Sequence, residues 1–244
     1  MKVALFIPCY VDQFYPQVGI AALQLLEKLG CQPEYPLEQT CCGQPMANAG
    51  CELDAQRAYW HFVHTFKGYD YIVAPSGSCV YHLRHHYSFL EQTPEVQHIR
   101  ERALDLTEFL LDVLKVERLP AKFPHRVGLH QSCHGLRGLR LGQSSERNLP
   151  AFSKIKTLLD MVEGLELVEP ERPDECCGFG GTFAVNEAAV SVKMGKNRIA
   201  DHLRQGAEVI TAGDMSCLMH LEGLIRRQRQ PLRVLHLAEI LNAW

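Results

Sequence analysis

Short apolar runs alternate with longer amphipathic segments along the first half of the chain. Residues 3–7, Val-Ala-Leu-Phe-Ile, are typical of a buried strand. Over 18–29, apolar residues recur every three or four positions, which predicts a helix with one buried face that Gly30 ends. The same reasoning predicts three further elements: a short strand at 31–35, a helix at 53–66 and a strand at 71–74.

The second half of the chain repeats this order. It contains strand-like runs at 127–129, 166–168 and 208–211, and helical periodicity at 146–161 and 184–204. Both halves also end similarly, with Leu-Thr-Glu-Phe-Leu at 106–110 and Leu-Ala-Glu-Ile-Leu at 237–241. Landmarks in the same order indicate two copies of one unit. We place the boundary near 120–124, Pro-Ala-Lys-Phe-Pro, which predicts one repeat at 1–120 and a second at 121–244.

Alternating strands and helices predict an α/β fold. Such units form mainly parallel sheets with right-handed crossover connections, and 244 residues suffice for one large domain or two smaller ones. Ligands of open parallel sheets bind beyond the carboxyl ends of the strands. The residues that follow each predicted strand are therefore the candidates for function.

Composition and charge exclude several classes of protein. Hydrophobic residues make up 46% of the chain and charged residues 22%, as in globular proteins, so the composition does not predict disorder. A net charge of -3 provides no basic field for nucleic acid or anionic lipid. No apolar stretch approaches the roughly 20 residues of a membrane span, and Pro8 interrupts the N-terminal run. We therefore expect a cytoplasmic protein, in which ten cysteines are more typical of metal or redox sites than of disulfides.

Eight cysteines recur at matching places after the predicted strands. The first repeat contains Cys9, Cys41, Cys42 and Cys79, and the second contains Cys133, Cys176, Cys177 and Cys217. Because the carboxyl ends of parallel strands share one edge, each repeat can bring four thiols together. Four thiolates are the usual ligand set of a 4Fe-4S cluster, so we predict one iron–sulfur cluster per repeat, held by these residues. Zinc in one or both sites, or buried thiols without a metal, are the alternatives.

The two Cys-Cys-Gly triplets are unusual in themselves. Neighbouring Cα atoms lie about 3.8 Å apart, below the range that suits a disulfide. Cysteines that bind one tetrahedral zinc ion are usually separated by two to four residues, so an adjacent pair is poorly suited to it. Gly43 and Gly178 permit positive φ and let backbone N–H groups approach inorganic sulfur. The segment 179–183, Phe-Gly-Gly-Thr-Phe, is a candidate backbone nest around sulfur, whereas a dinucleotide loop would require Gly-x-Gly-x-x-Gly spacing.

Several other residues lie close to the motif cysteines. His134 directly follows Cys133 and is a candidate hydrogen-bond donor to a cluster. A possible metal face contains His82, His85 and His86, but the second repeat shows only His220 at the matching place, which favours solvated or hydrogen-bonding roles. Two cysteines have no counterpart in the other repeat. Cys31 is assigned to the core, and a supporting role near the first pair is only the minor alternative for Cys51.

The chain contains no bacterial ferredoxin run of cysteines, no flavin or nicotinamide fingerprint and no convincing acid/base pair. A protein with electron carriers and no evident substrate pocket is typical of one subunit of a redox assembly. No catalytic residue is predicted from the sequence.

At these residues the sequence resembles the CCG-domain family of cysteine-rich proteins. Its duplicated unit has the form Cys…Cys-Cys-Gly…Cys-x-x-Cys and occurs in the cysteine-rich subunit of heterodisulfide reductase and in glycolate oxidase iron–sulfur subunits. The similarity covers nearly the whole chain and is greatest to members that take part in lactate utilisation. The motifs that carry it are Cys41-Cys42-Gly43-Gln44-Pro45, Pro75-Ser76-Gly77-Ser78-Cys79, Cys176-Cys177-Gly178-Phe179-Gly180-Gly181-Thr182-Phe183 and Gly213-Asp214-Met215-Ser216-Cys217-Leu218-Met219.

The resemblance implies an electron-transfer subunit of a system that oxidises L-lactate to pyruvate. Its partners would be a ferredoxin-like iron–sulfur subunit and a third subunit. The heterodisulfide reductase relatives imply an alternative, a thiol–disulfide oxidoreductase that works at a cluster, and a zinc-stabilised scaffold is a third possibility. Ser76 and Asp214 stand at the first position of the final Cys-x-x-Cys, so each repeat lacks the extra thiolate that the non-cubane clusters of those relatives use.

Overall fold

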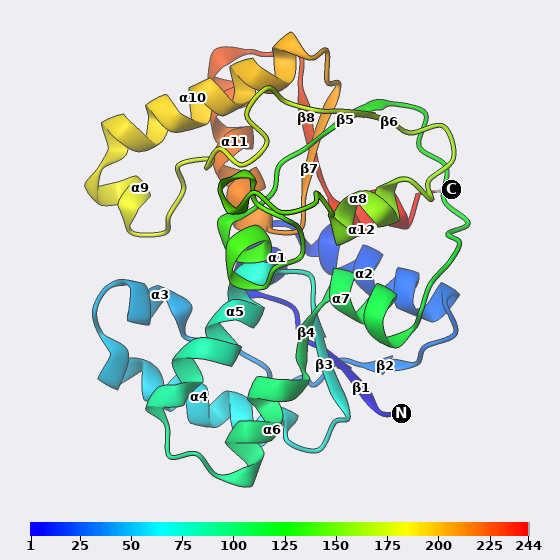
Figure 1. Cartoon of the computed structure of the whole chain (residues 1–244). Helices are drawn as coiled ribbons and strands as arrows, with labels where there is room; N and C mark the ends of the chain where they lie inside the picture. Colours follow the sequence, from blue (N-terminus) through cyan, green and yellow to red (C-terminus); the bar gives the residue numbers. More distant parts are fainter. Residues whose placement is uncertain (244) are drawn as a thin grey trace.

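Two parallel four-stranded sheets organise the computed structural model of the protein, which describes residues 1–243 (Figure 1). The first sheet has the order β2-β1-β3-β4 and contains β1 (Val3–Leu5), β2 (Pro33–Glu34), β3 (Tyr71–Ala74) and β4 (Ala103–Asp105). The second has the order β6-β5-β7-β8 and contains β5 (Arg126–Leu129), β6 (Glu166–Val168), β7 (Val209–Ala212) and β8 (Arg233–His236). The predicted α/β class with parallel sheets is confirmed.

The two sheets pair in the same register. Residues 3–5 of β1 lie opposite 71–73 of β3, and residues 127–129 of β5 lie opposite 209–211 of β7. One residue beyond each first strand, the Phe6 N–H donates to the Val73 carbonyl at 2.9 Å. In the second sheet the His130 N–H donates to the Thr211 carbonyl at 2.8 Å. Phe6 and His130 therefore occupy equivalent places in the two sheets.

Helices connect the strands on both sides. The first half contains α1 (Cys9–Phe14), α2 (Pro16–Lys28), α3 (Gln44–Asn48), α4 (Glu52–Phe66), α5 (Gly77–His85), α6 (Pro94–Arg102) and α7 (Leu106–Glu108). The second half contains α8 (Lys154–Leu159), α9 (Phe183–Asn186), α10 (Ala188–Arg204), α11 (Met215–Gln228) and α12 (Leu237–Leu241). Single turns of 3-10 or π helix lie at His86–Phe89, Phe109–Val113, His134–Gly138 and Ser145–Arg147.

One hydrophobic core joins the two halves. Helices α2, α7, α8 and α12 lie between the sheets, where α2 packs on α12 and α7 on α8 (Figure 1). Leu25 and Leu26 of α2 are buried in the same cluster as Leu158 of α8 and Ile240 of α12. A second cluster, around Phe62, has all its buried members in the first half. Because the larger core crosses the proposed boundary, the bounds 1–120 and 121–244 stay a prediction.

Some predicted elements differ from the structure. The helix expected at 146–161 is wrong, because Asn148 has a φ of 52° and Pro150 follows it, so the α-helix forms only over Lys154–Leu159. The helix expected at 184–204 is divided by Glu187, whose φ is -119° and ψ 46°, into α9 and α10. Strands β4 and β8, the fourth strand of each sheet, were not predicted.

The two sheets end in matching capping boxes. At the end of β4, the Asp105 side chain accepts from the Thr107 N–H at 2.8 Å, and Glu108 accepts from the Asp105 N–H at 3.1 Å. At the end of β8, His236 Nδ1 accepts from the Ala238 N–H at 3.1 Å in the same arrangement. This shared local chemistry accounts for the similar segments at 106–110 and 237–241.

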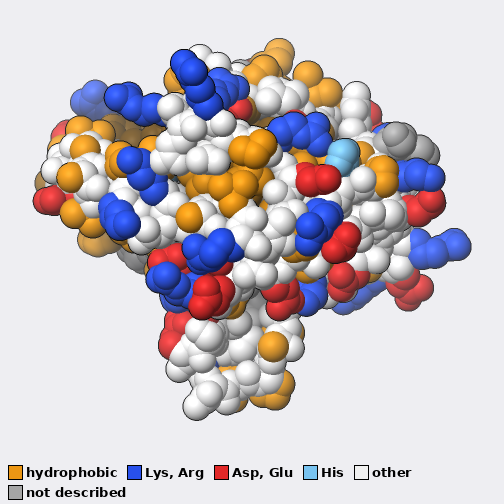
Figure 2. Space-filling model, turned by 90° about the horizontal axis from the view of Figure 1, so that it is seen from above, with side chains coloured by type: hydrophobic (Ala, Val, Ile, Leu, Met, Phe, Trp, Pro, Cys, Tyr) orange, Lys and Arg blue, Asp and Glu red, His pale blue; other side chains and the backbone are white. Residues whose placement is uncertain are grey.

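Charges of both signs lie side by side on the surface. Figure 2 shows Lys and Arg side chains interspersed with Asp and Glu around a patch of hydrophobic side chains on one face. Within residues 1–243, no helix has the length and apolar character that a bilayer crossing requires.

Candidate functional site

The eight motif cysteines lie just beyond the strands of the two sheets. Cys9 begins α1 after β1, and Cys79 lies in the first turn of α5 after β3; Cys133 and Cys217 hold the matching places after β5 and β7. The two adjacent pairs lie in the loops that lead to α3 and α9, namely Cys41 with Cys42 and Cys176 with Cys177. All eight thiols are free of disulfides.

Within each half the four thiols form a continuous series of contacts. In the first quartet, the Cys9 and Cys41 sulfur atoms lie 3.8 Å apart, and the Cys42 thiol hydrogen-bonds to both Cys41 and Cys79. The second quartet repeats this order, with contacts that run from Cys133 to Cys176, Cys177 and Cys217. The fold therefore brings each predicted set of four together, and the two sets have the same internal order.

One cysteine of each quartet is stabilised as a thiolate. The thiols of Cys42 and Cys9 donate to Cys41 and lower its pKa to about 3. Cys133 and then Cys177 do the same for Cys176, whose pKa falls to about 2. The pKa of the donating Cys9 and Cys133 thiols is raised by these hydrogen bonds and then by burial. Each quartet thus carries negative charge at neutral pH, and a bound cation would displace the remaining protons.

The glycine of each Cys-Cys-Gly triplet is required by its surroundings. Gly43 has a φ of 91° and Gly178 a φ of 90°. A Cβ at Gly43 would lie 2.5 Å from the Tyr59 ring, and one at Gly178 would lie 2.6 Å from the Ser191 carbonyl oxygen. This geometry lets the Gly43 N–H donate to the Cys41 sulfur at 3.4 Å and the Gly178 N–H donate to Cys176 at 3.3 Å.

Both quartets open onto a single cavity of about 550 Å³ between the two halves. The wall contains all eight cysteines together with apolar side chains, among them Tyr10, Phe179 and Val185. Across it, the Thr182 hydroxyl donates to the Asn48 carbonyl at 3.4 Å. Among the described residues that line the cavity there is no lysine or arginine. The two sites predicted from the repeats therefore face a shared space, which sequence periodicity did not indicate.

Ser76 and Asp214 connect the two halves at the wall of this cavity. They form an isolated antiparallel bridge, and Asp214 Oδ1 accepts from the Ser76 hydroxyl and from the Ser78 N–H, each at 3.0 Å. Asp214 Oδ2 accepts from the Ser132 hydroxyl at 2.5 Å. The Asp214 side chain is buried. Ser76 and Asp214 thus bind each other across the two halves.

We expect Asp214→Ala to lower the free energy of unfolding by about 3–5 kcal/mol, because it leaves buried donors of Ser76, Ser78 and Ser132 without an acceptor. Asp214→Asn keeps the shape and one acceptor oxygen and should cost less. Urea unfolding of both variants measures the difference. Equal stability of the alanine variant and the native protein would contradict a joining role for this residue.

The predicted nest lies beside the second quartet. Gly180 and Gly181 have positive φ values of 55° and 62°, and the Phe179 N–H donates to the Cys177 sulfur at 3.4 Å. These residues line the cavity. Contact of the nest with inorganic sulfur stays a prediction.

His82, His85 and His86 do not form a metal-binding group among the residues that the structure describes. His82 is fully buried and stacks on His86 with ring centroids 4.5 Å apart. Neither ring nitrogen of His82 has a hydrogen-bond partner among the described residues, and burial lowers its pKa to about 3. The solvated or hydrogen-bonding role predicted for this residue is therefore wrong. His85 instead stacks on Tyr81, with centroids 4.2 Å apart.

Two other predicted histidines lie nearer the cysteines. His134 lines the cavity, and its ring centroid lies 5.1 Å from that of Tyr81. Its role as a hydrogen-bond donor to a cluster stays a prediction. His220 lies 3.4 Å from the Ser191 carbonyl oxygen through Nε2. Of the cysteines outside the quartets, Cys31 is buried in the core as predicted, whereas Cys51 is exposed and absent from the cavity wall.

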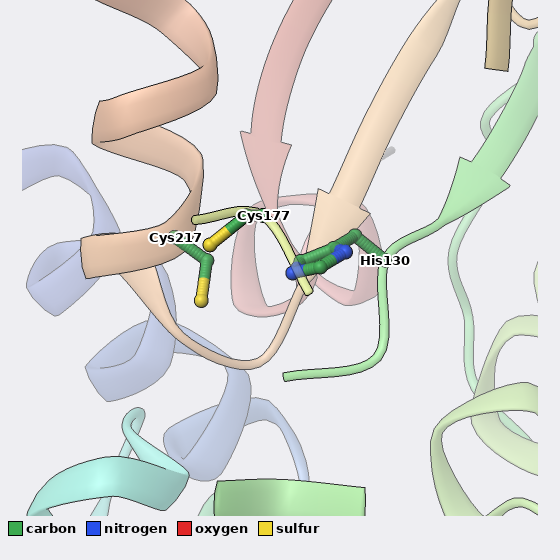
Figure 3. A group of neighbouring side chains, drawn as sticks. All are labelled: His130, Cys177 and Cys217. Atoms are coloured by element: carbon green, nitrogen blue, oxygen red, sulfur yellow. The ribbon is translucent and has the colours of Figure 1, made fainter. Parts of the chain in front are cut away.

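His130 was not predicted from the sequence. This residue follows β5, is buried, and lies with Cys177 and Cys217 in a group whose ligand atoms are all within 4.8 Å of one another (Figure 3). Its Nδ1 accepts from Arg198 Nε at 3.2 Å. The available signal was an asymmetry of the repeats, since the first repeat has the apolar Phe6 at the equivalent place.

Comparison with known proteins agrees with this duplicated site. The profile of the cysteine-rich domain family, CCG, matches residues 3–84 and 127–222. Relatives named lactate utilization protein A include that of Exiguobacterium sp., 41% identical over 99% of this chain and 97% of the relative. That of Geobacillus thermodenitrificans is 40% identical over 99% of each. A glutamate racemase of Bacillus anthracis shares 10% identity with a TM-score of 0.36 over 99% of this chain and 78% of its own, too distant for functional inference.

The resemblance that the motifs predicted is thereby confirmed. The family profile covers most of both halves, and the relatives are aligned over nearly their whole length. The matched segments contain all eight cysteines of the two quartets. The chain belongs to the CCG family of cysteine-rich domain proteins.

Proposed function

We propose that the chain is an iron–sulfur electron-transfer subunit. Each quartet would hold one 4Fe-4S cluster, the first through Cys9, Cys41, Cys42 and Cys79 and the second through Cys133, Cys176, Cys177 and Cys217. The observation that carries this proposal is the repeated series of thiol contacts beyond equivalent strands of two equivalent sheets. Core thiols without a ligand have no reason to converge twice in the same order.

The donor set fits such a cluster. Four thiols per quartet match the usual thiolate count, and backbone N–H groups of Gly43, Gly178 and Phe179 already donate to cysteine sulfur. When bound, a cluster supplies reversible one-electron transfer. The N–H groups stabilise negative charge on sulfur, and the apolar part of the cavity wall limits access of water.

We place this electron transfer in lactate utilisation, the process named in the relatives. The cavity wall offers no lysine or arginine among its described residues, so a small carboxylate substrate lacks the cation that usually holds it. L-lactate would therefore be oxidised to pyruvate on another subunit, and this chain would pass the electrons on. The proposed partners are a ferredoxin-like iron–sulfur subunit and a third subunit, in the cytoplasm.

The shared cavity supports a second candidate function. Because both quartets face one space, a disulfide substrate could reach either site, as in a thiol–disulfide oxidoreductase. Turnover of a disulfide by the isolated chain would favour this function. A requirement for the partner subunits and lactate would favour the first.

Metal analysis under strict anaerobiosis tests the proposal. We expect about eight iron and eight acid-labile sulfide per chain, which corresponds to two four-iron clusters. Zinc held by the cysteines of one or both quartets is the alternative. Stoichiometric zinc with no sulfide and no visible absorbance in freshly purified protein would replace the electron-transfer function with a structural metal.

A further inference from the structure

We propose that His130 donates its Nε2–H to sulfur at the second site and thereby makes that site easier to reduce. This inference rests on the proposed function, since it concerns a cluster held by the second quartet. It goes further by assigning a role to a residue outside the cysteine motifs and by making the two sites chemically unequal.

The two halves differ at this position although the backbone is the same. Phe6 and His130 donate equivalent backbone hydrogen bonds to the third strand of their sheets. In the first half the Phe6 ring packs edge-on against Phe62 with centroids 4.9 Å apart, which offers no hydrogen-bond donor to sulfur. His82 and His220 do not create this difference, because both lie three residues after the last cysteine of their quartet. His134, which has Tyr10 as its counterpart, packs against the Tyr81 ring.

Arg198 determines which nitrogen of His130 carries the proton. Its Nε donates to His130 Nδ1 at 3.2 Å. A guanidinium has donors only and does not lose its proton in proteins, so Nδ1 must be the acceptor. The proton of the neutral ring is therefore on Nε2. A metal ligand at Nε2 would need the proton on Nδ1. His130 is therefore a hydrogen-bond donor and not an additional ligand.

The Arg198 side chain is itself held firmly. It is fully buried on α10, and its NH2 group donates to the carbonyl oxygens of Leu129 at 3.5 Å and Pro173 at 3.4 Å. NH1 donates to the Arg172 carbonyl and lies 3.6 Å from Asp201 Oδ2. Arg198 thus connects the end of β5 to the loop that leads to the second cysteine pair. The imidazole is consequently fixed in both position and tautomer.

The remaining nitrogen faces the thiols. Nε2 is buried and has no hydrogen-bond partner among the described residues. In Figure 3 the outer end of the ring points toward the sulfur atoms of Cys177 and Cys217, consistent with the 4.8 Å limit on this group. A buried N–H without an acceptor is costly, and sulfur that becomes more negative on reduction is a suitable acceptor. Such a hydrogen bond stabilises the reduced form and raises its potential.

A redox titration of the whole protein, followed by electron paramagnetic resonance, tests this role. His130→Phe copies the residue of the first half and should shift the reduction equilibrium of the second site about tenfold toward the oxidised form, equal to about 59 mV for one electron. The first site should keep its potential. His130→Gln retains an N–H donor and should recover part of the shift. Unchanged potentials in His130→Phe, with both clusters present, would overturn the inference while leaving the proposed function in place.

A second measurement uses the native protein, so it does not depend on whether a variant folds. In native protein labelled with ¹⁵N-histidine, hyperfine spectroscopy of the reduced second site should show the weak coupling of a hydrogen-bonded nitrogen. Strong coupling typical of an iron ligand, or no coupling, would overturn the donor role. Absence of iron and sulfide from the native protein would overturn the proposed function together with this inference, so the two failures are distinguishable.

Discussion

Cys177→Ser is expected to remove the cluster of the second site and leave the first, so that iron falls from about eight to about four atoms per chain. Cys177 is buried in the middle of its quartet, where it contacts both Cys176 and Cys217. A serine hydroxyl stays protonated at neutral pH and is a much weaker iron ligand than a thiolate. Iron and sulfide analysis with electron paramagnetic resonance measures the loss.

Two further variants control this experiment. Cys42→Ser is the matching change in the first quartet and should remove the other half of the iron. Cys51→Ser changes an exposed cysteine outside the cavity and should leave the iron content as it is. Because both quartets face one cavity, a single shared centre is the physical alternative. Loss of all iron from either quartet variant would indicate that shared centre and contradict separate sites.

Acid is expected to unfold the metal-free protein, and four buried histidines together with Asp105 should lower its stability by about 4 kcal/mol per pH unit between about pH 6 and 4. Burial lowers the pKa of four histidines, to about 3 in His82 and His130, about 2 in His202 and about 4 in His236. In the unfolded chain a histidine has a pKa near 6.5. Below that pH the unfolded state therefore binds up to four more protons than the folded state.

Asp105 opposes this trend. Burial and then the nearby Glu108 carboxyl raise its pKa to about 7, so the folded state holds a proton that the unfolded state releases above about pH 4. Its contribution to stability is present at low pH and is lost as the pH rises through 7. For these five groups, one proton subtracted from about four leaves a net uptake of about three on unfolding. The Cys41 and Cys176 thiolates act in the same direction as the histidines, because the unfolded thiols are protonated at this pH.

Urea unfolding at several pH values measures this slope. His202→Phe replaces a ring with no hydrogen-bond partner among residues 1–243 and should reduce the slope by about 1.4 kcal/mol per pH unit. Asp105→Asn removes the opposing group and should steepen it by a similar amount. A slope that neither substitution changes would show that other groups control the acid transition.

The repeats made much of the site predictable before the fold was known. Strand-like runs that end in cysteine and the two Cys-Cys-Gly triplets recur in the same order, and parallel strands present their carboxyl ends on one edge. The structure brings each quartet together as expected. The bounds of short elements were predicted less accurately. Apolar periodicity favoured a helix from residue 146, but the positive φ of Asn148 and the ring of Pro150 prevent it from beginning before Lys154.

The asymmetric parts of the site depended on contacts that no local pattern contains. Asp214 lies far from Ser76 and Ser132 in the chain, and Arg198 also lies far from His130. A single difference between the repeats, such as histidine in place of phenylalanine, indicates that the two sites differ. It does not indicate which residue the histidine contacts. Only the packed arrangement shows that Arg198 sets the tautomer of that histidine.

The amino-acid sequence by itself determined the α/β class, the sets of cysteines and the family, because these follow from local periodicity and from motifs repeated along the chain. Tertiary structure alone decided that both quartets share one cavity, that Ser76 and Asp214 join the halves, and that His130 faces the second quartet. The physical reason is that these features arise from contacts between buried polar groups that are distant in the chain, and such contacts exist only after the hydrophobic core has brought the two sheets together.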